Sequence, residues 1–155
     1  MTWTEILSQP IAPDEIEWRV LSAKDGKMTI VPYITNRCVM RRFDEAFGAA
    51  NWCSEFREIG HGFICRLTVD IDGKTVFRED GATKTDIEPE KGGISDAMKR
   101  TAVQFGLGRK LYNYPRIQIA HNSKFIPHWA YPTLNKLVGW LNEGNQKDYV
   151  LIEQK

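Results

Sequence analysis

The segment that decides the fold is residues 95–112, which read SDAMKRTAVQFGLGRKLY. Apolar residues recur in it at helical spacing, and this predicts a helix with one buried stripe. The stripe consists of Ile94, Ala97, Met98, Thr101, Ala102 and Phe105. Gly106-Leu107-Gly108 supplies the C-terminal stop. Lys99 and Arg100 fall on the two flanks of the opposite side, with Val103 between them, so we predict that both cations face solvent.

The strongest β signal of the chain precedes this helix, between residues 52 and 86. Five apolar residues alternate with mostly polar ones, namely Phe63, Cys65, Leu67, Val69 and Ile71. Such alternation predicts a strand with one buried face. A glycine turn at 60–62 links it to an earlier strand over 53–59, and Asp72-Gly73 forms a hairpin turn into a strand over 74–80. A three-stranded antiparallel meander is expected.

A hairpin and a helix are predicted before the meander. Alternation from Ile16 to Val20, a turn at 24–27 and a β-rich run over 28–33 indicate the hairpin. Thr35 then offers an N-cap and Gly48 a C-terminal stop. The apolar face of the helix between them carries Val39, Phe43, Ala46 and Phe47, and its opposite face carries Arg37, Arg41 and Asp44. Arg37 and Arg41 are therefore expected to project together.

Three further segments complete the prediction. Residues 5–10 form a short helical or irregular lead-in, residues 83–93 form an exposed polar loop, and residues 132–142 form a last helix. The fold class is α+β, with an antiparallel sheet packed on helices. With 155 residues, 42% of them hydrophobic, we expect one domain over 1–155 that ends in a C-terminal helical segment over 116–155.

The charge of the chain is segregated along the sequence. The net charge is only +1. Residues 1–96 carry 12 Lys and Arg against 17 Asp and Glu, whereas residues 97–142 carry seven cations and no carboxylate. The seven are Lys99, Arg100, Arg109, Lys110, Arg116, Lys124 and Lys136. This pattern favours an anionic partner for the basic segment, and the alternative is that its cations pair with acids of the first half.

The remaining composition excludes several classes of protein. Cys38, Cys53 and Cys65 are odd in number and lack CxxC spacing, which is typical of small buried hydrophobes in a reducing compartment rather than of a zinc site. No basic N-terminal region precedes an apolar segment, and no apolar run is long enough to cross a bilayer. We expect a soluble cytoplasmic protein of a bacterial or phage-infected cell, with no membrane partner.

The order of the elements, together with individual residues, resembles one known family. The residues that carry the resemblance are YITNR at 33–37, FG at 47–48, NW at 51–52, CRLTV at 65–69, EDG at 79–81 and the whole of 95–112. Over about residues 16–115 the chain resembles the single-strand DNA annealing protein family of DdrA, phage Sak and the eukaryotic radiation-sensitivity annealing recombinase. The combination of helix, KR pair, FG break and GR-x-LY tail in one run makes the resemblance specific.

This resemblance implies a β-β-β-α core that assembles into homo-oligomeric rings or arcs, with single-stranded DNA in a positive outer groove. By position, it makes Arg37, Lys99 and Arg100 the DNA-binding residues that touch phosphates. The candidate groove is extended by Arg41, Arg109 and Lys110, and either Lys84 or Lys91 corresponds to a loop lysine of the family. Two positions depart from the eukaryotic pattern, since Val103 and Ile71 stand where further basic residues occur there.

The function implied is ATP-independent binding of single-stranded DNA and annealing of complementary strands in recombination and double-strand-break repair. We expect no enzyme activity, no catalytic residue, no metal and no cofactor, because the chain lacks a phosphate-binding G-x-x-x-x-G-K-[ST] loop and a complete dinucleotide fingerprint. Possible partners are an exonuclease or a single-strand-binding protein. The aromatic side chains at 33, 52, 112 and 114 are expected in the core rather than stacked on bases.

Two alternatives from other classes stay open. Pro13-Asp14 with Asp25-Gly26-Lys27 imitates the acidic motif of a magnesium-dependent nuclease, and Asp72-Gly73-Lys74 repeats its second half, although both triplets lie where hairpin turns are expected. The acids at 70, 72, 79 and 80 are explained as a solvated sheet face rather than a metal cluster. The second alternative is a partner-binding module whose basic helix docks onto an acidic protein.

Overall fold

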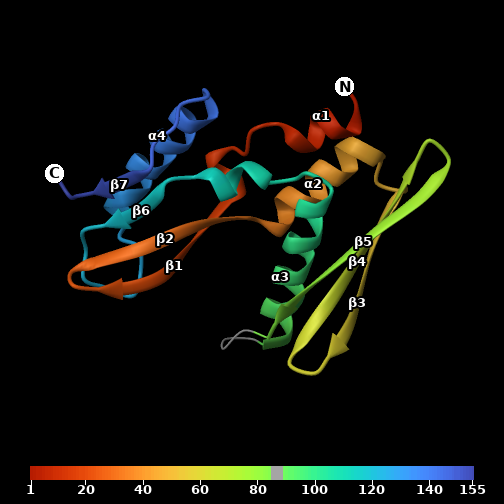
Figure 1. Cartoon of the computed structure of the whole chain (residues 1–155), viewed down its shortest axis with the longest axis horizontal. Helices are drawn as coiled ribbons and strands as arrows, with labels where there is room; N and C mark the ends of the chain where they lie inside the picture. The colour runs from red at the N-terminus through yellow and green to blue at the C-terminus, as the bar shows by residue number, and fades with distance from the viewer. Residues whose placement is uncertain (85–88) are drawn as a thin grey trace. The chain divides into compact units, whose positions relative to one another are not determined.

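The structure is a computed structural model that describes residues 1–84 and 89–155. The chain forms two compact units (Figure 1). The first consists of Met1–Gln9 and Thr35–Arg109, and the second of Pro10–Ile34 and Lys110–Lys155. The α+β class is confirmed in both, because each contains a sheet packed against helices. That residues 1–155 fold as one domain stays a prediction.

The first unit is built on the predicted meander. Strands β3 (Trp52–Ile59), β4 (Gly62–Ile71) and β5 (Lys74–Thr83) pair antiparallel in that order. Four alternate residues of β4 are buried, namely Phe63, Cys65, Leu67 and Val69. Helix α3 (Pro89–Gln104) packs along β4 and β5 and covers this face (Figure 1). The alternation of apolar residues in β4 therefore specified both the strand and its buried face.

Two short helices complete the first unit. Helix α2 (Asn36–Phe47) begins where Thr35 accepts a hydrogen bond from the Cys38 amide at 3.1 Å. It ends at Gly48, whose φ of 91° favours glycine. Helix α1 (Trp3–Ser8) packs against α2, and the buried guanidinium of Arg42 joins them by donating to the carbonyl oxygens of Ile6 and Gln9 at 3.0 and 3.2 Å.

The second unit contains a four-stranded sheet of order β1-β2-β6-β7. Its elements in chain order are η1 (Pro13–Glu15), β1 (Ile16–Lys24), β2 (Lys27–Ile34), β6 (Arg116–Ile119), η3 (His128–Ala130), α4 (Tyr131–Asn142) and β7 (Tyr149–Ile152), and η2 (Arg109–Asn113) begins at the boundary between the units. The hairpin β1–β2 and helix α4 are confirmed. The core is formed by Met28, Ile30, Ile117, Ile119, Ala130, Leu134 and Ile152.

Two predictions about segments were wrong. Residues 116–155 are not only helical, because β6 and β7 pair in parallel there. The expected loop over 83–93 is shorter, since β5 reaches Thr83 and α3 already begins at Pro89, so that both glycines of the Gly92-Gly93 pair lie in the helix. Part of that predicted loop, residues 85–88, lies outside the described residues.

The burial predicted for three side chains was also wrong. Cys53 is exposed because it pairs with Thr68 on the face of the sheet opposite Leu67 and Val69. Tyr112 is 72% exposed and Tyr33 38% exposed, whereas Trp52 and Tyr114 are half-buried. Cys38 and Cys65 are buried, as expected.

In the part of the chain that the structure describes, none of the helices has the length and apolar character needed to span a membrane.

Candidate nucleic-acid interface

Two arginines project from α2, as the sequence predicts. Arg37 and Arg41 are both exposed and lie four residues apart, which places them about 6 Å apart along the helix axis. Asp44, predicted on the same side, accepts a hydrogen bond from Trp52 Nε1 at 2.7 Å. This contact fixes the carboxylate of Asp44 at the end of the helix toward β3, and the exposed pair at 37 and 41 forms the first part of the candidate interface.

Helix α3 carries the second part, but only one of its two predicted cations is exposed. The side chain of Arg100 is 58% exposed, and its Nε lies 3.5 Å from Asp80 Oδ1 on β5. Lys99 is only 6% exposed, so the prediction that it faces solvent was wrong. The helix itself does not cause the difference, because both residues lie about 130° from the centre of the buried stripe at ~100° per residue. The packing around each flank decides it.

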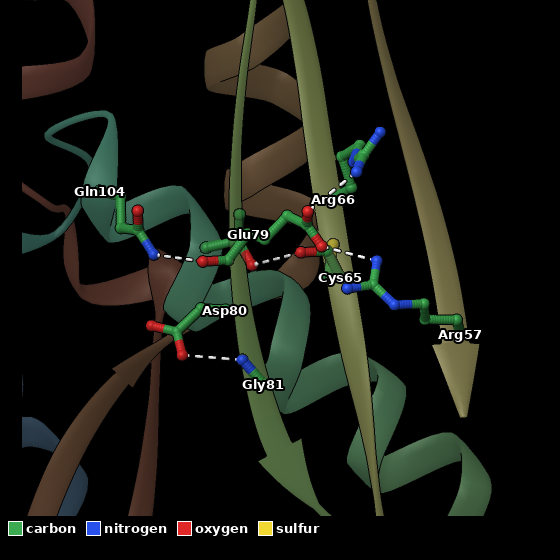
Figure 2. A network of polar contacts seen from close by, with 8 residues as sticks. Arg57, Cys65, Arg66, Glu79, Asp80, Gly81 and Gln104 are labelled. Carbon is green, nitrogen blue, oxygen red and sulfur yellow. Dashed lines mark hydrogen bonds and ion pairs between the residues drawn. The ribbon is translucent and has the colours of Figure 1, made fainter. Parts of the chain in front are cut away.

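Side-chain hydrogen bonds fix how α3 lies on the sheet. Thr101 Oγ1 is within hydrogen-bond distance of the Cys65 carbonyl oxygen at 3.2 Å, and of the Ala97 carbonyl oxygen at 2.7 Å. One turn after Arg100, Gln104 Nε2 donates to the backbone oxygen of Glu79 at 2.6 Å (Figure 2). Arg100 and Gln104 thus reach consecutive residues of β5, which gives the Arg100 side chain a defined direction.

Arg109 is exposed, and its guanidinium is hydrogen-bonded to the C-terminal end of α3. Its Nε donates to the Val103 carbonyl oxygen and its Nη2 to that of Gln104, both at 2.8 Å. A guanidinium here caps carbonyls that the helix leaves unpaired and interacts favourably with the helix dipole. Arg109 therefore has a structural role that the sequence analysis did not foresee. Lys110 is exposed and belongs to the second unit.

The two candidate loop lysines have different surroundings. Lys84 is half-buried, its Nζ lies 3.4 Å from Glu58 Oε1, and it sits 5.6 Å from the centre of the Phe63 ring. Lys91 is exposed and lies in the first turn of α3 rather than in a loop. Of the two, Lys91 is the more accessible cation.

An ion-pair network that the sequence patterns did not reveal lies on the face of the sheet away from α3. Glu79 Oε2 accepts from Arg57 at 2.6 Å and Oε1 accepts from Arg66 at 2.9 Å (Figure 2). The hydrogen bond from Arg66, which has the larger effect, and the hydrogen bond from Arg57 lower the pKa of Glu79 below its usual value. In the register of β4 and β5, Arg66 and Glu79 are direct cross-strand partners. Pairing the predicted strands residue by residue would therefore have indicated this ion pair.

The two Asp-Gly-Lys triplets of the nuclease alternative begin in hairpin turns, whereas Pro13-Asp14 lies in η1. Asp25 and Gly26 have φ of 55° and 73°, and Asp72 and Gly73 have φ of 49° and 81°. Two consecutive residues with positive φ define the tight hairpin turn for which Asp-Gly is preferred. Within residues 1–84 and 89–155, no group of three or more His, Cys, Asp and Glu side chains is placed to hold a metal ion.

Comparison with known protein families gives the class of protein, which is double-strand break repair. Residues 1–129 match the family described as Rad52/22 family double-strand break repair protein, and the chain belongs to this family. The match is longer than the 16–115 on which the resemblance rested.

Two relatives are described as single-stranded DNA-binding protein DdrA. The chain is 29% identical to the one from Deinococcus deserti over 138 residues, which cover 81% of this chain and 68% of that protein. It is also 29% identical to the one from Deinococcus radiodurans over 114 residues, which cover 71% of this chain and 54% of that protein. The chain therefore spans only about half to two thirds of the length of these relatives.

Proposed function

We propose that this protein binds single-stranded DNA through phosphate contacts and anneals complementary strands without ATP. The observation that carries the proposal is the exposed pair Arg37 and Arg41, one turn apart on α2, in a chain of the Rad52/22 family. Arg100 on α3, in the same compact unit, adds a third exposed cation. The names of both relatives, which describe binding of single-stranded DNA, support the same conclusion.

Phosphate contacts suit annealing because they carry no sequence information. A surface of arginines holds any strand by its backbone, and bases that face away from the protein stay free to pair with a complement. Base pairing itself supplies the driving force, so no nucleotide hydrolysis is needed. In the double-strand-break repair that the family description names, this step would join strands exposed by resection.

The small number of exposed cations on α2 and α3 leads us to include assembly of several copies of the chain in the same proposal. Each chain offers three clearly exposed arginines on α2 and α3, and a monomer with so few contacts would bind weakly. A ring or arc of copies would multiply those contacts on one strand and raise the overall affinity without any new type of contact. A partner exonuclease or single-strand-binding protein stays a prediction.

Annealing of two complementary oligonucleotides, measured by fluorescence quenching in EDTA without ATP, tests the proposal. The wild-type protein should speed annealing and leave the oligonucleotide length unchanged. An annealing rate equal to that without protein would refute the function, and shortening of the oligonucleotides when magnesium is supplied would favour the nuclease instead.

The double variant Arg37→Ala/Arg41→Ala tests the interface. Loss of two phosphate contacts should reduce the slope of log K against log salt by about 1.4, at ~0.7 per phosphate on a single strand. Lys24→Ala/Lys147→Ala is the matched control, since both lysines are exposed in the second unit and neither is predicted to touch DNA. An unchanged slope in the arginine variant, or an equal reduction in the control, would show that the interface lies elsewhere.

A further inference from the structure

Asp80 holds the guanidinium that the proposed function assigns to DNA. Its Oδ1 lies 3.5 Å from Arg100 Nε, and the Asp80 side chain is 31% exposed against 58% for Arg100. The same oxygen accepts a hydrogen bond from the Gly81 amide at 2.7 Å (Figure 2). The backbone contact keeps the carboxylate in place, so Arg100 faces a fixed anion rather than a mobile one.

The surrounding contacts keep the two groups together. Thr101 and Gln104 attach α3 to the backbone of Cys65 and Glu79, and Cys65 is the cross-strand partner of Asp80. Arg100 directly precedes the first of these attachments along the helix and lies one turn before the second. The pair with Asp80 is therefore set by the packing of α3 on the sheet, and the remaining nitrogens of the guanidinium lie on a side chain that is mostly exposed.

We propose that Asp80 acts as an intramolecular competitor of DNA phosphate for Arg100. A carboxylate and a phosphate offer a guanidinium the same kind of charge-assisted contact. In the free protein the Asp80 carboxylate contacts the Arg100 guanidinium. When a strand binds, a phosphate replaces the carboxylate as the partner of Arg100, and the phosphates then lie close to the negative charge of Asp80. Asp80 thereby lowers the affinity for single-stranded DNA and favours strands that engage several cations at once. This inference rests on the proposed function.

Asp80→Asn is the sharpest variant for the test. The asparagine side-chain oxygen can still accept from the Gly81 amide, so the local backbone contact is kept while the charge is lost. An exposed ion pair contributes little free energy, so the gain is expected to be small. Removing the charge of Asp80 should tighten binding of an oligothymidine about two- to fivefold at low salt. Asp72→Asn is the control, because it removes the same charge roughly 20 Å away in the turn that precedes β5, and asparagine tolerates the positive φ of that turn.

A double-mutant cycle with Arg100→Ala separates competition from general electrostatics. The gain from Asp80→Asn should largely disappear in the Arg100→Ala background. An equal gain in both backgrounds, an equal gain from Asp72→Asn, or weaker binding by Asp80→Asn would overturn the inference while leaving the proposed function in place. If the wild-type protein binds no oligothymidine at all, the proposed function fails, and the inference fails with it.

Discussion

Tyr114 has a buried hydroxyl whose cost can be measured. Its oxygen is buried and has no hydrogen-bond partner among the residues that the structure describes. The ring packs against the core of the second unit, with its centroid 6.4 Å from that of Trp18. A buried hydroxyl without a partner costs about 1–3 kcal/mol of desolvation. Tyr114→Phe keeps the ring and removes this cost, so the variant should be more stable by about 1 kcal/mol, or by about 2–4 °C in Tm for a chain of this size.

The pH dependence gives a second measure of the same group. Burial raises the pKa of Tyr114 to about 12, above the ordinary value near 10 that applies when the chain is unfolded. The neutral hydroxyl therefore favours the folded state below pH 10, and this contribution is lost as the pH rises toward 12. The wild-type protein should lose roughly 2 kcal/mol over that range from this group, and Tyr114→Phe should not.

Urea denaturation followed by circular dichroism at pH 7, 10, 11 and 12 measures both effects. Tyr112→Phe is the matched control, because that hydroxyl lies two residues away on a side chain that is 72% exposed, and it should change nothing. If Tyr114→Phe lowered the free energy of unfolding by 1 kcal/mol or more at pH 7, the hydroxyl would have a partner in the folded protein. The reasoning from burial would then be refuted.

Two further predictions concern the meander. Burial raises the pKa of Cys65 to about 11, so a thiol reagent at pH 8 should label the exposed Cys53 in the native protein and all three cysteines only in urea; fast labelling of Cys65 in the native protein, seen by peptide mass, would contradict this. Because Arg66 and Arg57 lower the pKa of Glu79, this group stabilises the fold above pH 4–5 and its contribution disappears as the pH falls below the folded-state value. Glu79→Gln should therefore flatten the acid limb of a plot of urea midpoint against pH, and an unchanged limb would show that the network contributes nothing.

Local patterns predicted the elements that carry their own signal. Alternation from Phe63 to Ile71 fixed the central strand of the meander and its buried face, because a period of two residues has only one way to face a core. Thr35 and Gly48 fixed the ends of α2 through capping and a positive φ. Strands β6 and β7 escaped prediction because each has only four residues and they pair in parallel across a long separation in sequence.

The candidate site was predictable only as far as a single helix specifies it. Arg37 and Arg41 lie directly opposite the buried stripe of α2, where any packing leaves them exposed. The role of Arg109 as a cap depends on the path of the chain after Gly108, and the pairing of Glu79 depends on the register of three strands. Neither can be deduced from the spacing of residues along one element.

Lys99 and Arg100 show how this limit affects the proposed interface. Both lie on the edges of the exposed face of α3, at equal angles from its buried stripe, and a helical wheel therefore treats them alike. Tertiary packing buries Lys99 and leaves Arg100 exposed beside Asp80. For Arg100, the alternative that basic residues of the second half pair with acids of the first half is thus correct. Among the exposed cations of α2 and α3, the strongest candidates for the proposed site are therefore Arg37, Arg41 and Arg100, and Arg100 also contacts Asp80. Lys91, at the start of α3, is a further exposed cation. Because each chain offers so few exposed cations at the proposed site, the affinity for single-stranded DNA depends on how many copies of the chain bind one strand. The interface variants should therefore be compared at equal oligomer size.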